Sequence, residues 1–379
     1  MAGFPLVLEL CGTADRQGRG TRSIRLTTVI ACGGAYIAGL HGLRAGGELP
    51  RARAVEGRPR PGGTAFQEHR SMRYPMRYPM RYLLLVLMAL CAPLHAAPAS
   101  DAERFASGLQ FPEGTVFVGD TLYFVDYGTS AVLRLGADRS AVHAWQSAGC
   151  GPNGLLPLAD GTMLVACYDA GTVEQRTLDG RLLRTVDRGA QGEPLVRPND
   201  LAPDGHGGAY FTASGGAQGI EGRLYHLAAG LARADMVVDH VQNANGVALS
   251  PDGRTLYLGE STTDKLLRFD VAADGSLTGR RDFLVLDDLG HGERLPGDGR
   301  HTPDGVRTDP SGHVYVSLYN GDGFAVFGAD GRLLATQSLP GTHHANLAIS
   351  PDQAWVYGTI DDDEGSLYRV RNPLAPPRG

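Results

Sequence analysis

The sequence lacks the features that mark a membrane-spanning, a helical or a zinc-binding protein. Its apolar run at Leu83–Leu90 is too short to cross a bilayer, which takes about 20 residues in a helix. No segment shows a sustained helical periodicity of apolar residues. Of the five cysteines, only Cys150 and Cys167 lie beyond residue 99, and neither has metal-site spacing with a histidine. A β-rich fold and a site without thiolate ligands are therefore expected.

Residues 72–99 have the pattern of a secretory signal peptide. Arg-Tyr-Pro-Met repeats, the apolar run Leu83–Leu90 and the small-residue tail Ala96–Ala99 follow one another. We therefore expect export to the periplasm or the exterior, with methionines 72, 76 and 80 as candidate starts. Residues 1–71, rich in Gly and Arg, are interpreted as a mis-called extension or a disordered segment. A genuine N-terminal segment of unknown role is the alternative.

Basic charge is scarce beyond residue 99. Residues 1–99 hold 13 of the 35 Lys and Arg residues and 5 of the 41 Asp and Glu residues, which leaves 22 basic and 36 acidic residues in 100–379. The resulting net charge near −14 is unfavourable for nucleic-acid binding. The expected partner is a small molecule, and the mature chain is expected to be a monomer or a small homo-oligomer.

Six similar segments follow one another from residue 113 onward. Most consist of a polar residue, an apolar run, a turn such as Pro251–Gly253, and a β-rich run that ends in an aromatic or small residue. They begin at Glu113, Asn153, Asn199, Asn245, Asp304 and Asn346, at spacings of 40 to 59 residues. Repeats of this length with several short strands predict an all-β fold over residues 100–379: a six-bladed β-propeller with four-stranded antiparallel blades around a central channel.

Three features outside the repeat pattern complete this prediction. Blade six shows only three strands, and Ala102–Leu109 is expected to supply the fourth and close the ring. Asp287–His301, rich in Gly and Asp, is expected to overhang one face of the channel as a lid or rim. For Cys150 and Cys167, a disulfide and two buried thiols both stay open, because geometry cannot be checked from sequence.

The polar residues that open the repeats predict a cation site. The first strand of each blade lines the channel, so one polar residue at its start gives a ring around the axis. Carboxylate and amide oxygens suit Ca²⁺ or Mg²⁺, and neither His nor Cys stands at a ring position. Asn-Gly and Asp-Gly are also hairpin-turn dipeptides. Separate turns downstream, at Pro251–Gly253 and Asp309–Gly312, weaken that alternative.

Some polar residues near the ring have a simpler interpretation. Asn153 and Asn346 are expected to cap strands or hold loops rather than to contact a ligand. His343 and His344 open the sixth repeat, where a histidine near the channel mouth could assist proton transfer. A solvated loop is the preferred interpretation for both. The acidic run Asp361–Glu364 is likewise interpreted as a solvated loop rather than as a second calcium site.

Four of the motifs resemble the signatures of a known family. Pro112-Glu113-Gly114, Arg197-Pro198-Asn199-Asp200, Asn243-Ala244-Asn245-Gly246 and Pro303-Asp304-Gly305 resemble, in order and spacing, those of the senescence-marker-protein/gluconolactonase family of regucalcin-like lactonases, related to diisopropylfluorophosphatase. The resemblance implies that Glu113, Asn245 and Asp304 bind a divalent metal. It also implies that Asn199 and Arg197 contact substrate, with Asn199 an additional metal contact. Thr115 and Ala213 depart from the family pattern, which leaves the substrate class open.

The resemblance and the ring chemistry together predict a metal-dependent hydrolase of lactones or related esters. One divalent cation, with Ca²⁺ favoured over Mg²⁺, Mn²⁺ or Zn²⁺, would polarise the lactone carbonyl and activate water. Asp304 is the expected general base, and Arg197 the expected partner of a sugar hydroxyl, a carboxylate or the oxyanion. The alternatives are a phosphotriesterase, a non-enzymatic cation-stabilised scaffold, and a strictosidine-synthase-like enzyme without a metal, which the oxygen ring disfavours.

Overall fold

The structure is a computed structural model that describes residues 101–375, apart from 217–218, 231–232, 290–294, 296–299 and 363, and four strands near the N-terminus. Those strands are β1 (Val7–Ala14), β2 (Gly20–Thr27), β3 (Ile30–Cys32) and β4 (Ala35–Ile37), with β1 paired to β2 and β3 paired to β4. They belong to a unit, Met1–Cys91, separate from the unit Ala92–Gly379. The predicted signal peptide at 72–99 and most of the predicted extension at 1–71 lie outside the described residues.

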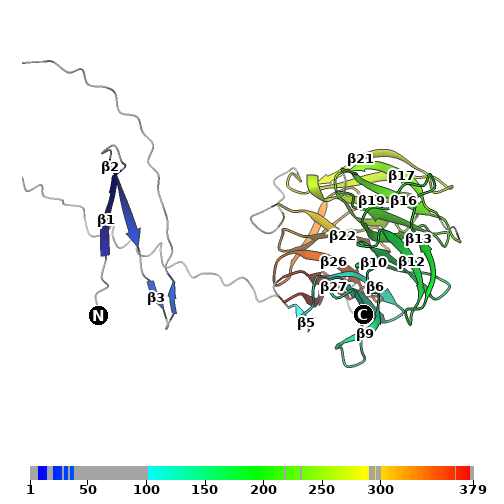
Figure 1. The fold of residues 1–379 in the computed structure, drawn as a ribbon, viewed down its shortest axis with the longest axis horizontal. Coiled ribbons are helices and arrows are strands. Elements are labelled where there is room, and N and C mark those ends of the chain that lie inside the picture. Colours follow the sequence, from blue (N-terminus) through cyan, green and yellow to red (C-terminus); the bar gives the residue numbers. More distant parts are fainter. Residues whose placement is uncertain are drawn as a thin grey trace, which may run out of the picture. The chain divides into compact units, whose positions relative to one another are not determined.

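From Asp101 onward, the described chain forms six four-stranded antiparallel sheets (Figure 1). Blades one to three contain β6 (Pro112–Val118), β7 (Thr121–Asp126), β8 (Ala131–Leu135), β9 (Ala141–Gln146); β10 (Pro152–Pro157), β11 (Thr162–Cys167), β12 (Thr172–Thr177), β13 (Leu182–Val186); and β14 (Pro198–Pro203), β15 (Ala209–Ala213), β16 (Gly222–Leu227), β17 (Asp235–Val241). Blades four to six contain β18 (Ala244–Leu249), β19 (Thr255–Glu260), β20 (Lys265–Val271), β21 (Leu277–Val285); β22 (Pro303–Thr308), β23 (Val314–Leu318), β24 (Gly323–Phe327), β25 (Leu333–Ser338); and β26 (His344–Ile349), β27 (Trp355–Ile360), β28 (Ser366–Arg371), β5 (Glu103–Ala106). The predicted all-β six-bladed propeller is confirmed.

The ring closes as the sequence predicts. β5, from the start of the domain, pairs antiparallel with β28 at its end and completes blade six. The first strands β6, β10, β14, β18, β22 and β26 each contact the next around the channel, and β26 contacts β6. Within the described residues, the 3₁₀ turn η1 (Ser261–Thr263) is the one helical element, and no helix is long and apolar enough to cross a bilayer. Much of the predicted lid, Asp287–His301, lies outside the described residues and stays a prediction.

The hydrophobic core lies between the blades. Six clusters of buried side chains each combine residues of two adjacent blades. In β11, Leu164 and Ala166 pack toward blade three, whereas Met163, Val165 and Cys167 pack toward blade one. Because side chains alternate along a strand, a continuous apolar run of this kind serves both faces of the blade. Packing on both faces holds the first strands in place around the channel.

Each first strand contains a one-residue irregularity where it meets the channel. In blade four, Ala244 pairs with Glu260, but the next pair is Val247 with Leu258, so β18 holds one residue more than β19 over this stretch. The other five blades have a register shift at the same place. A β-bulge bends the strand and redirects the side chains at that point. The residue at this bulge in blade four is Asn245, one of the predicted ring residues.

The glycines that follow the ring residues lie within strands rather than in turns. Gly154 is part of β10, and Gly246 is part of β18. A Cβ atom on Gly246 would overlap the backbone oxygen of Asp304 in the next blade, and one on Gly154 would overlap that of Asn199. Glycine is needed here because the first strands of adjacent blades approach each other closely. The hairpin-turn interpretation of these dipeptides is therefore excluded.

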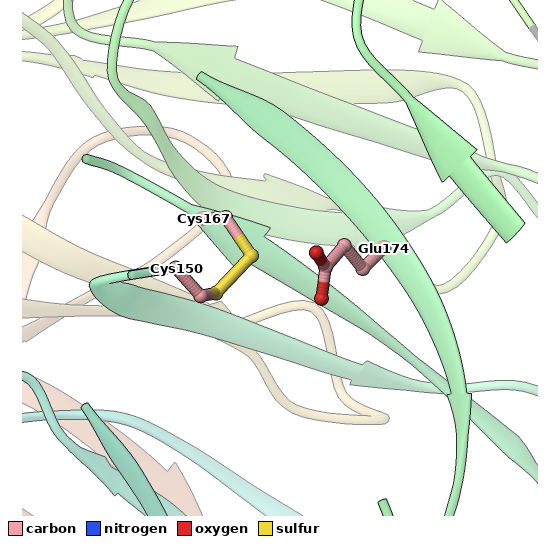
Figure 2. Close-up of side chains that lie close together, drawn as sticks. All are labelled: Cys150, Cys167 and Glu174. Atoms are coloured by element: carbon pink, nitrogen blue, oxygen red, sulfur yellow. A yellow bond between two sulfur atoms is a disulfide. The ribbon is translucent and has the colours of Figure 1, made fainter. Parts of the chain in front are cut away.

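A disulfide joins Cys150 to Cys167 in blade two, with 4.6 Å between the two Cα atoms (Figure 2). Cys167 ends β11 opposite Pro152, and Gly151, with a φ of 57°, gives the bend that brings Cys150 back to it. Glu174 lies beside the two sulfur atoms. Because the sulfurs are bonded to each other, this group offers no thiolate to a metal. Of the two alternatives left open by the sequence, the structure contains the disulfide.

Removal of this disulfide should lower the free energy of unfolding by about 3 kcal/mol, the chain-entropy effect expected for a loop of this size. The sequence separation of the two cysteines is 17 residues. The double variant Cys150→Ala/Cys167→Ala should therefore unfold at a lower urea concentration than the oxidised wild type. Reductant should lower the wild-type midpoint and leave that of the double variant unchanged. A double variant as stable as the oxidised protein would contradict this account.

Candidate functional site

The strand register shows which residues are equivalent in the six blades. In each blade, one residue of the first strand pairs with the last residue of the second strand. The residue that follows it in the first strand is called the ring residue. The ring residues are Glu113, Asn153, Asn199, Asn245, Asp304 and Ala345. Asn346 lies one position further along and is equivalent to Asp200, since the backbone N–H groups of the two bond the hydroxyls of Thr359 and Thr212. The predicted equivalence of Asn346 with the other five openers is therefore wrong by one residue.

Two further positions recur around the channel mouth. The residue two places before each ring residue accepts a backbone hydrogen bond from the first residue after the second strand, in all six blades. The acceptor–donor pairs are Phe111 and Tyr127, Gly151 and Tyr168, Arg197 and Ser214, Asn243 and Ser261, Thr302 and Tyr319, and His343 and Asp361. In five of the six repeats, the aromatic or small residue that ends the β-rich run is the sequence signal for the donor position. Arg197, at the acceptor position, is a predicted site residue, whereas no donor residue was predicted from the sequence.

These positions enclose a cavity of about 320 Å³. Its base is lined by the ring residues Glu113, Asn153, Asn199, Asn245 and Asp304. Its wall is lined by Phe111, Tyr127, Tyr168, Ser214, Asn243, Ser261, Thr302 and Tyr319. The structure thus brings together all four predicted metal contacts. It adds Asn153, for which the sequence predicts a strand cap.

The two acids at the base of the cavity are buried, with exposed fractions of 3% for Glu113 and 5% for Asp304. Burial, and next the charge of Asp200, raise the pKa of Glu113 from 4.5 to about 8. Burial, and next the charge of Glu113, raise the pKa of Asp304 well above its usual value. Hydrogen bonds from Asn346 to Glu113 and from Asn245 to Asp304 oppose these pKa shifts without reversing them. A nearby cation would favour the ionised form of both groups.

The donor set at the base of the cavity fits a hard divalent cation. It offers two carboxyl groups and three carboxamides, with no thiol or imidazole among the lining residues. Oxygen ligands of this kind are preferred by Ca²⁺ and Mg²⁺. The sixth ring residue, Ala345, contributes no donor. Glu113, Asn199, Asn245 and Asp304 could therefore hold one such ion.

A hydrogen-bonded layer lies one to three residues beyond the ring along the first strands. Arg307 of β22 bonds the two carboxylate oxygens of Asp200 at 2.7 and 3.3 Å, and the side-chain oxygen of Asn346 at 2.9 Å. Thr115 donates to that same oxygen at 3.0 Å. Arg307 and Thr115 also line a second cavity, of about 400 Å³ and mostly apolar, toward the other end of the channel. No sequence motif predicted this layer.

Arg197 lies at the rim of the cavity rather than at its base. Its φ of 58° is in the left-handed region, a costly conformation that is found more often at functional sites. Its guanidinium is 5.5 Å from the ring centre of Tyr168 and donates to the backbone oxygen of Gly215 at 3.4 Å. Tyr127 contacts Tyr168 and Phe111 edge-on, with ring centres 5.9 and 5.8 Å apart. One side of the cavity is thus an aromatic wall with a cation at its edge.

Several histidine and acidic residues of blade six are less exposed than the solvated loops predicted for them. His344 is buried, and burial lowers the pKa of its imidazole to about 4, so it is a neutral core residue. His343 stacks on Tyr319, with ring centres 4.7 Å apart. Burial raises the pKa of Asp361, which is half-buried. Of the acidic run Asp361–Glu364, Glu364 is exposed, as predicted for a solvated loop, and residue 363 lies outside the described residues.

The raised pKa of Glu113 predicts that the cation-free protein loses stability as the pH rises. The folded-state pKa of about 8 exceeds the ordinary value of 4.5, so protonation of Glu113 favours the folded state. This stabilisation is complete below pH 4.5 and is lost as the pH rises through about 8. A cation binds the ionised carboxylates, so its affinity should rise over the same range. Thermal unfolding at several pH values across this window, with chelator and with Ca²⁺, measures both effects.

Glu113→Gln provides the control for this pH dependence. Its side chain cannot ionise, so the melting temperature of the chelated variant should change less with pH than that of the chelated wild type. Ca²⁺ should stabilise the wild type most at the alkaline end of the window and the variant little at any pH. A chelated wild type that becomes steadily more stable between about pH 5 and pH 8 would contradict the assignment.

The family comparison covers most of the propeller domain. The model of a protein family described as "SMP-30/Gluconolactonase/LRE-like region" matches residues 111–359. This span contains every ring residue. Among curated relatives, the lactonase drp35 of Staphylococcus haemolyticus (strain JCSC1435) is 27% identical over 262 residues, which are 66% of this chain and 76% of the relative.

Solved structures with the same architecture support the fold. A gluconolactonase from Xanthomonas campestris has a TM-score of 0.60 at 23% identity, over 72% of this chain and 89% of that one. A calcium-binding protein, regucalcin, from Agrobacterium tumefaciens strain C58 has a TM-score of 0.58 at 20% identity, over 72% and 95% of the two chains. At this level of identity the likeness concerns the fold.

Proposed function

The chain belongs to the SMP-30/gluconolactonase/LRE-like family, and we propose that it is a metal-dependent lactonase. The observation that carries the proposal is the pair of buried carboxyl groups, Glu113 and Asp304, set among carboxamides at the base of one cavity. The names of a lactonase relative and of a gluconolactonase of similar fold support the same class of reaction. Ca²⁺ is the favoured ion, in line with the oxygen donors and with the calcium-binding neighbour.

We assign the cation to Glu113, Asn245 and Asp304, with Asn199 as a further contact. A divalent cation bound there would polarise a lactone carbonyl and lower the pKa of a water molecule. Arg307, whose charge acts on Glu113, is already paired with Asp200. The two ring acids therefore need a charge partner from outside the chain in order to ionise together.

The remaining side chains of the cavity would bind and orient the lactone. Tyr127 and Tyr168 offer an apolar wall for the ring carbons and exclude water from them. Arg197, at the rim, would bind a hydroxyl or carboxylate that projects from the cavity. Asp304 would accept the proton of the attacking water. The water oxygen then bonds to the carbonyl carbon, the ring C–O bond breaks, and protonation of the alkoxide gives a hydroxy acid.

Turnover of a lactone panel tests this function. The purified protein is stripped of metal with a chelator and then supplied with Ca²⁺, Mg²⁺, Mn²⁺ or Zn²⁺ in turn, with sugar, aliphatic and aromatic lactones and one phosphotriester as substrates. We expect at least one lactone to be hydrolysed only when metal is restored. Preference for the phosphotriester would favour the phosphotriesterase alternative. No turnover, together with clear stabilisation by metal, would favour the scaffold.

We also propose that the protein is exported. The signal-peptide pattern of residues 72–99 supports this localisation, as does the Cys150–Cys167 disulfide, since such bonds persist mainly in oxidising compartments. Cell fractionation followed by mass measurement tests it. We expect an oxidised chain, cleaved near residue 99, outside the cytoplasm. A reduced and uncleaved chain in the cytoplasm would overturn the proposal.

A further inference from the structure

The disulfide of blade two lies at a position that is crosslinked in two other blades as well. In blades one and four, a carboxylate that ends the second strand accepts a hydrogen bond from the backbone N–H of the residue three places before the ring residue. The two acceptor–donor pairs are Asp126 and Gln110, at 2.7 Å, and Glu260 and Gln242, at 3.1 Å. Cys167 and Cys150 occupy the same two positions in blade two. A covalent bond thus stands where the other two blades have a hydrogen bond.

The disulfide (Figure 2) anchors the short loop that follows β11, residues 168–170, which we call the blade-two loop. Cys167 directly precedes this loop, and Tyr168, its first residue, lines the ring cavity. The Tyr168 N–H donates to the backbone oxygen of Gly151 at 2.9 Å, and the next two N–H groups donate to that of Cys150 at 3.1 and 3.2 Å. The disulfide and these three hydrogen bonds therefore join the loop to the same short segment.

The blade-two loop supports side chains from both neighbouring blades. The guanidinium of Arg197, from blade three, lies 5.5 Å from the ring centre of Tyr168. Tyr127, from blade one, packs edge-on against Tyr168, and its hydroxyl donates to the Asp169 side chain at 2.8 Å. A shift of the loop would therefore move the aromatic wall of the cavity together with the cation at its edge.

The proposed cation ligands do not depend on this loop. They lie on β6, β14, β18 and β22, the first strands of blades one, three, four and five. The four residues are Glu113, Asn199, Asn245 and Asp304. Blade two supplies none of them, so a change confined to the blade-two loop should act on substrate binding rather than on cation binding.

We propose that the Cys150–Cys167 disulfide is a positioning crosslink for the substrate-binding wall of the ring cavity. It holds the blade-two loop in the conformation that places Tyr168, and through Tyr168 the guanidinium of Arg197, before the substrate arrives. Without the bond, these groups become ordered only on binding, and their ordering consumes part of the binding free energy. The chain therefore binds its substrate tightly only in the oxidised form. This inference rests on the proposed lactonase function.

Lactone kinetics with Ca²⁺ present test the proposal by comparing the oxidised wild type with Cys150→Ala/Cys167→Ala. We expect KM to rise about 10-fold in the double variant, with kcat changed less than about twofold and Ca²⁺ affinity unchanged. Wild-type protein prepared as the dithiol should have the KM of the double variant. Its KM should return to the lower value when the disulfide is formed again, whereas the double variant should not respond to oxidant.

Two further variants separate positioning from a general loss of stability. Val186 is 2% exposed in β13, the outermost strand of the same blade. Val186→Ala should lower the melting temperature through lost packing but leave KM at the wild-type value. Tyr168→Ala should raise KM, and its effect should be smaller without the disulfide, because both changes act through the same side chain.

Hydrogen exchange tests the positioning without any substrate. The amides of residues 168–170 should exchange faster in the double variant than in Val186→Ala, whereas those of β14 and β22 should exchange alike in the two. Equal exchange at the loop, an unchanged KM, or an equal rise of KM in Val186→Ala overturns the positioning crosslink. Absence of lactone turnover in the wild type overturns the lactonase function instead, and exchange at the loop then decides on the crosslink alone.

Discussion

Asp304→Asn should lower kcat/KM for lactone hydrolysis by about 10³-fold or more while the protein stays folded. The substitution keeps the size of the side chain and removes one of the two negative charges at the base of the cavity, where Asp304 is 5% exposed. The affinity for Ca²⁺ should fall as well, because a neutral carboxamide replaces a charged oxygen ligand. Steady-state kinetics at several Ca²⁺ concentrations measure both effects.

Asp330→Asn is the matched control for this variant. Asp330 is exposed in the turn between β24 and β25 of the same blade, so the change in net charge is the same but lies away from the ring. It should hydrolyse the lactone at the wild-type rate. The assignment of Asp304 fails if the two variants behave alike, or if Asp304→Asn loses activity only because it no longer folds, as judged by its melting temperature.

Arg307→Met should destabilise the protein by about 3–5 kcal/mol, because it leaves the Asp200 carboxylate buried without its cation. Asp200 is 1% exposed, and Arg307 bonds it through two nitrogen atoms. The same substitution removes a hydrogen bond from Asn346. At a few degrees per kcal/mol, the melting temperature should fall by roughly 6–20 °C. Thermal and urea unfolding measure the loss.

The exposed pair of Arg281 and Asp270 gives the control for this effect. Arg281 also bonds its partner through two nitrogen atoms, at 3.0 and 2.8 Å, but both side chains are largely in solvent. Arg281→Met should leave the melting temperature nearly unchanged, since exposed ion pairs contribute little. Adding Asp200→Asn to Arg307→Met should recover part of the loss. Equal losses in the two single variants would contradict the role assigned to the layer beneath the ring.

Most of the fold could be predicted because each repeat carries its own local signals. The turn at Pro251–Gly253 separates two β-rich runs, and the structure places β18 and β19 on either side of it. The three-stranded pattern of the last repeat indicated a missing strand, and β5 supplies it. Both inferences use only the alternation and turn chemistry of short segments, which depend little on the rest of the chain.

The site could be predicted only where its residues repeat along the sequence. Glu113, Asn199, Asn245 and Asp304 share one motif position, and all four line the cavity. The identity of the sixth ring residue was missed because Asn346 resembles the other openers in type, whereas the register with β27 places Ala345 there. The type of a side chain does not show whether the strand register shifts by one residue at a β-bulge.

The layer beneath the ring and the tyrosines of the wall had no such signal. Arg307 and Asp200 are 107 residues apart, and their contact exists only because blades three and five face the same channel. In the sequence, Tyr319 is only the last residue of a β-rich run. In the structure, it lies on the cavity wall. Contacts of this kind follow from the closure of the ring rather than from any local segment.

The most direct test of the account is a Ca²⁺ titration of the chelator-treated protein. The heat of Ca²⁺ binding and the rate of lactone turnover are followed in parallel. The account predicts one cation per chain and turnover that rises in proportion to the bound fraction, with both signals lost in Asp304→Asn. Full turnover in the absence of any divalent cation, or Ca²⁺ binding that is unchanged in Asp304→Asn, would contradict it.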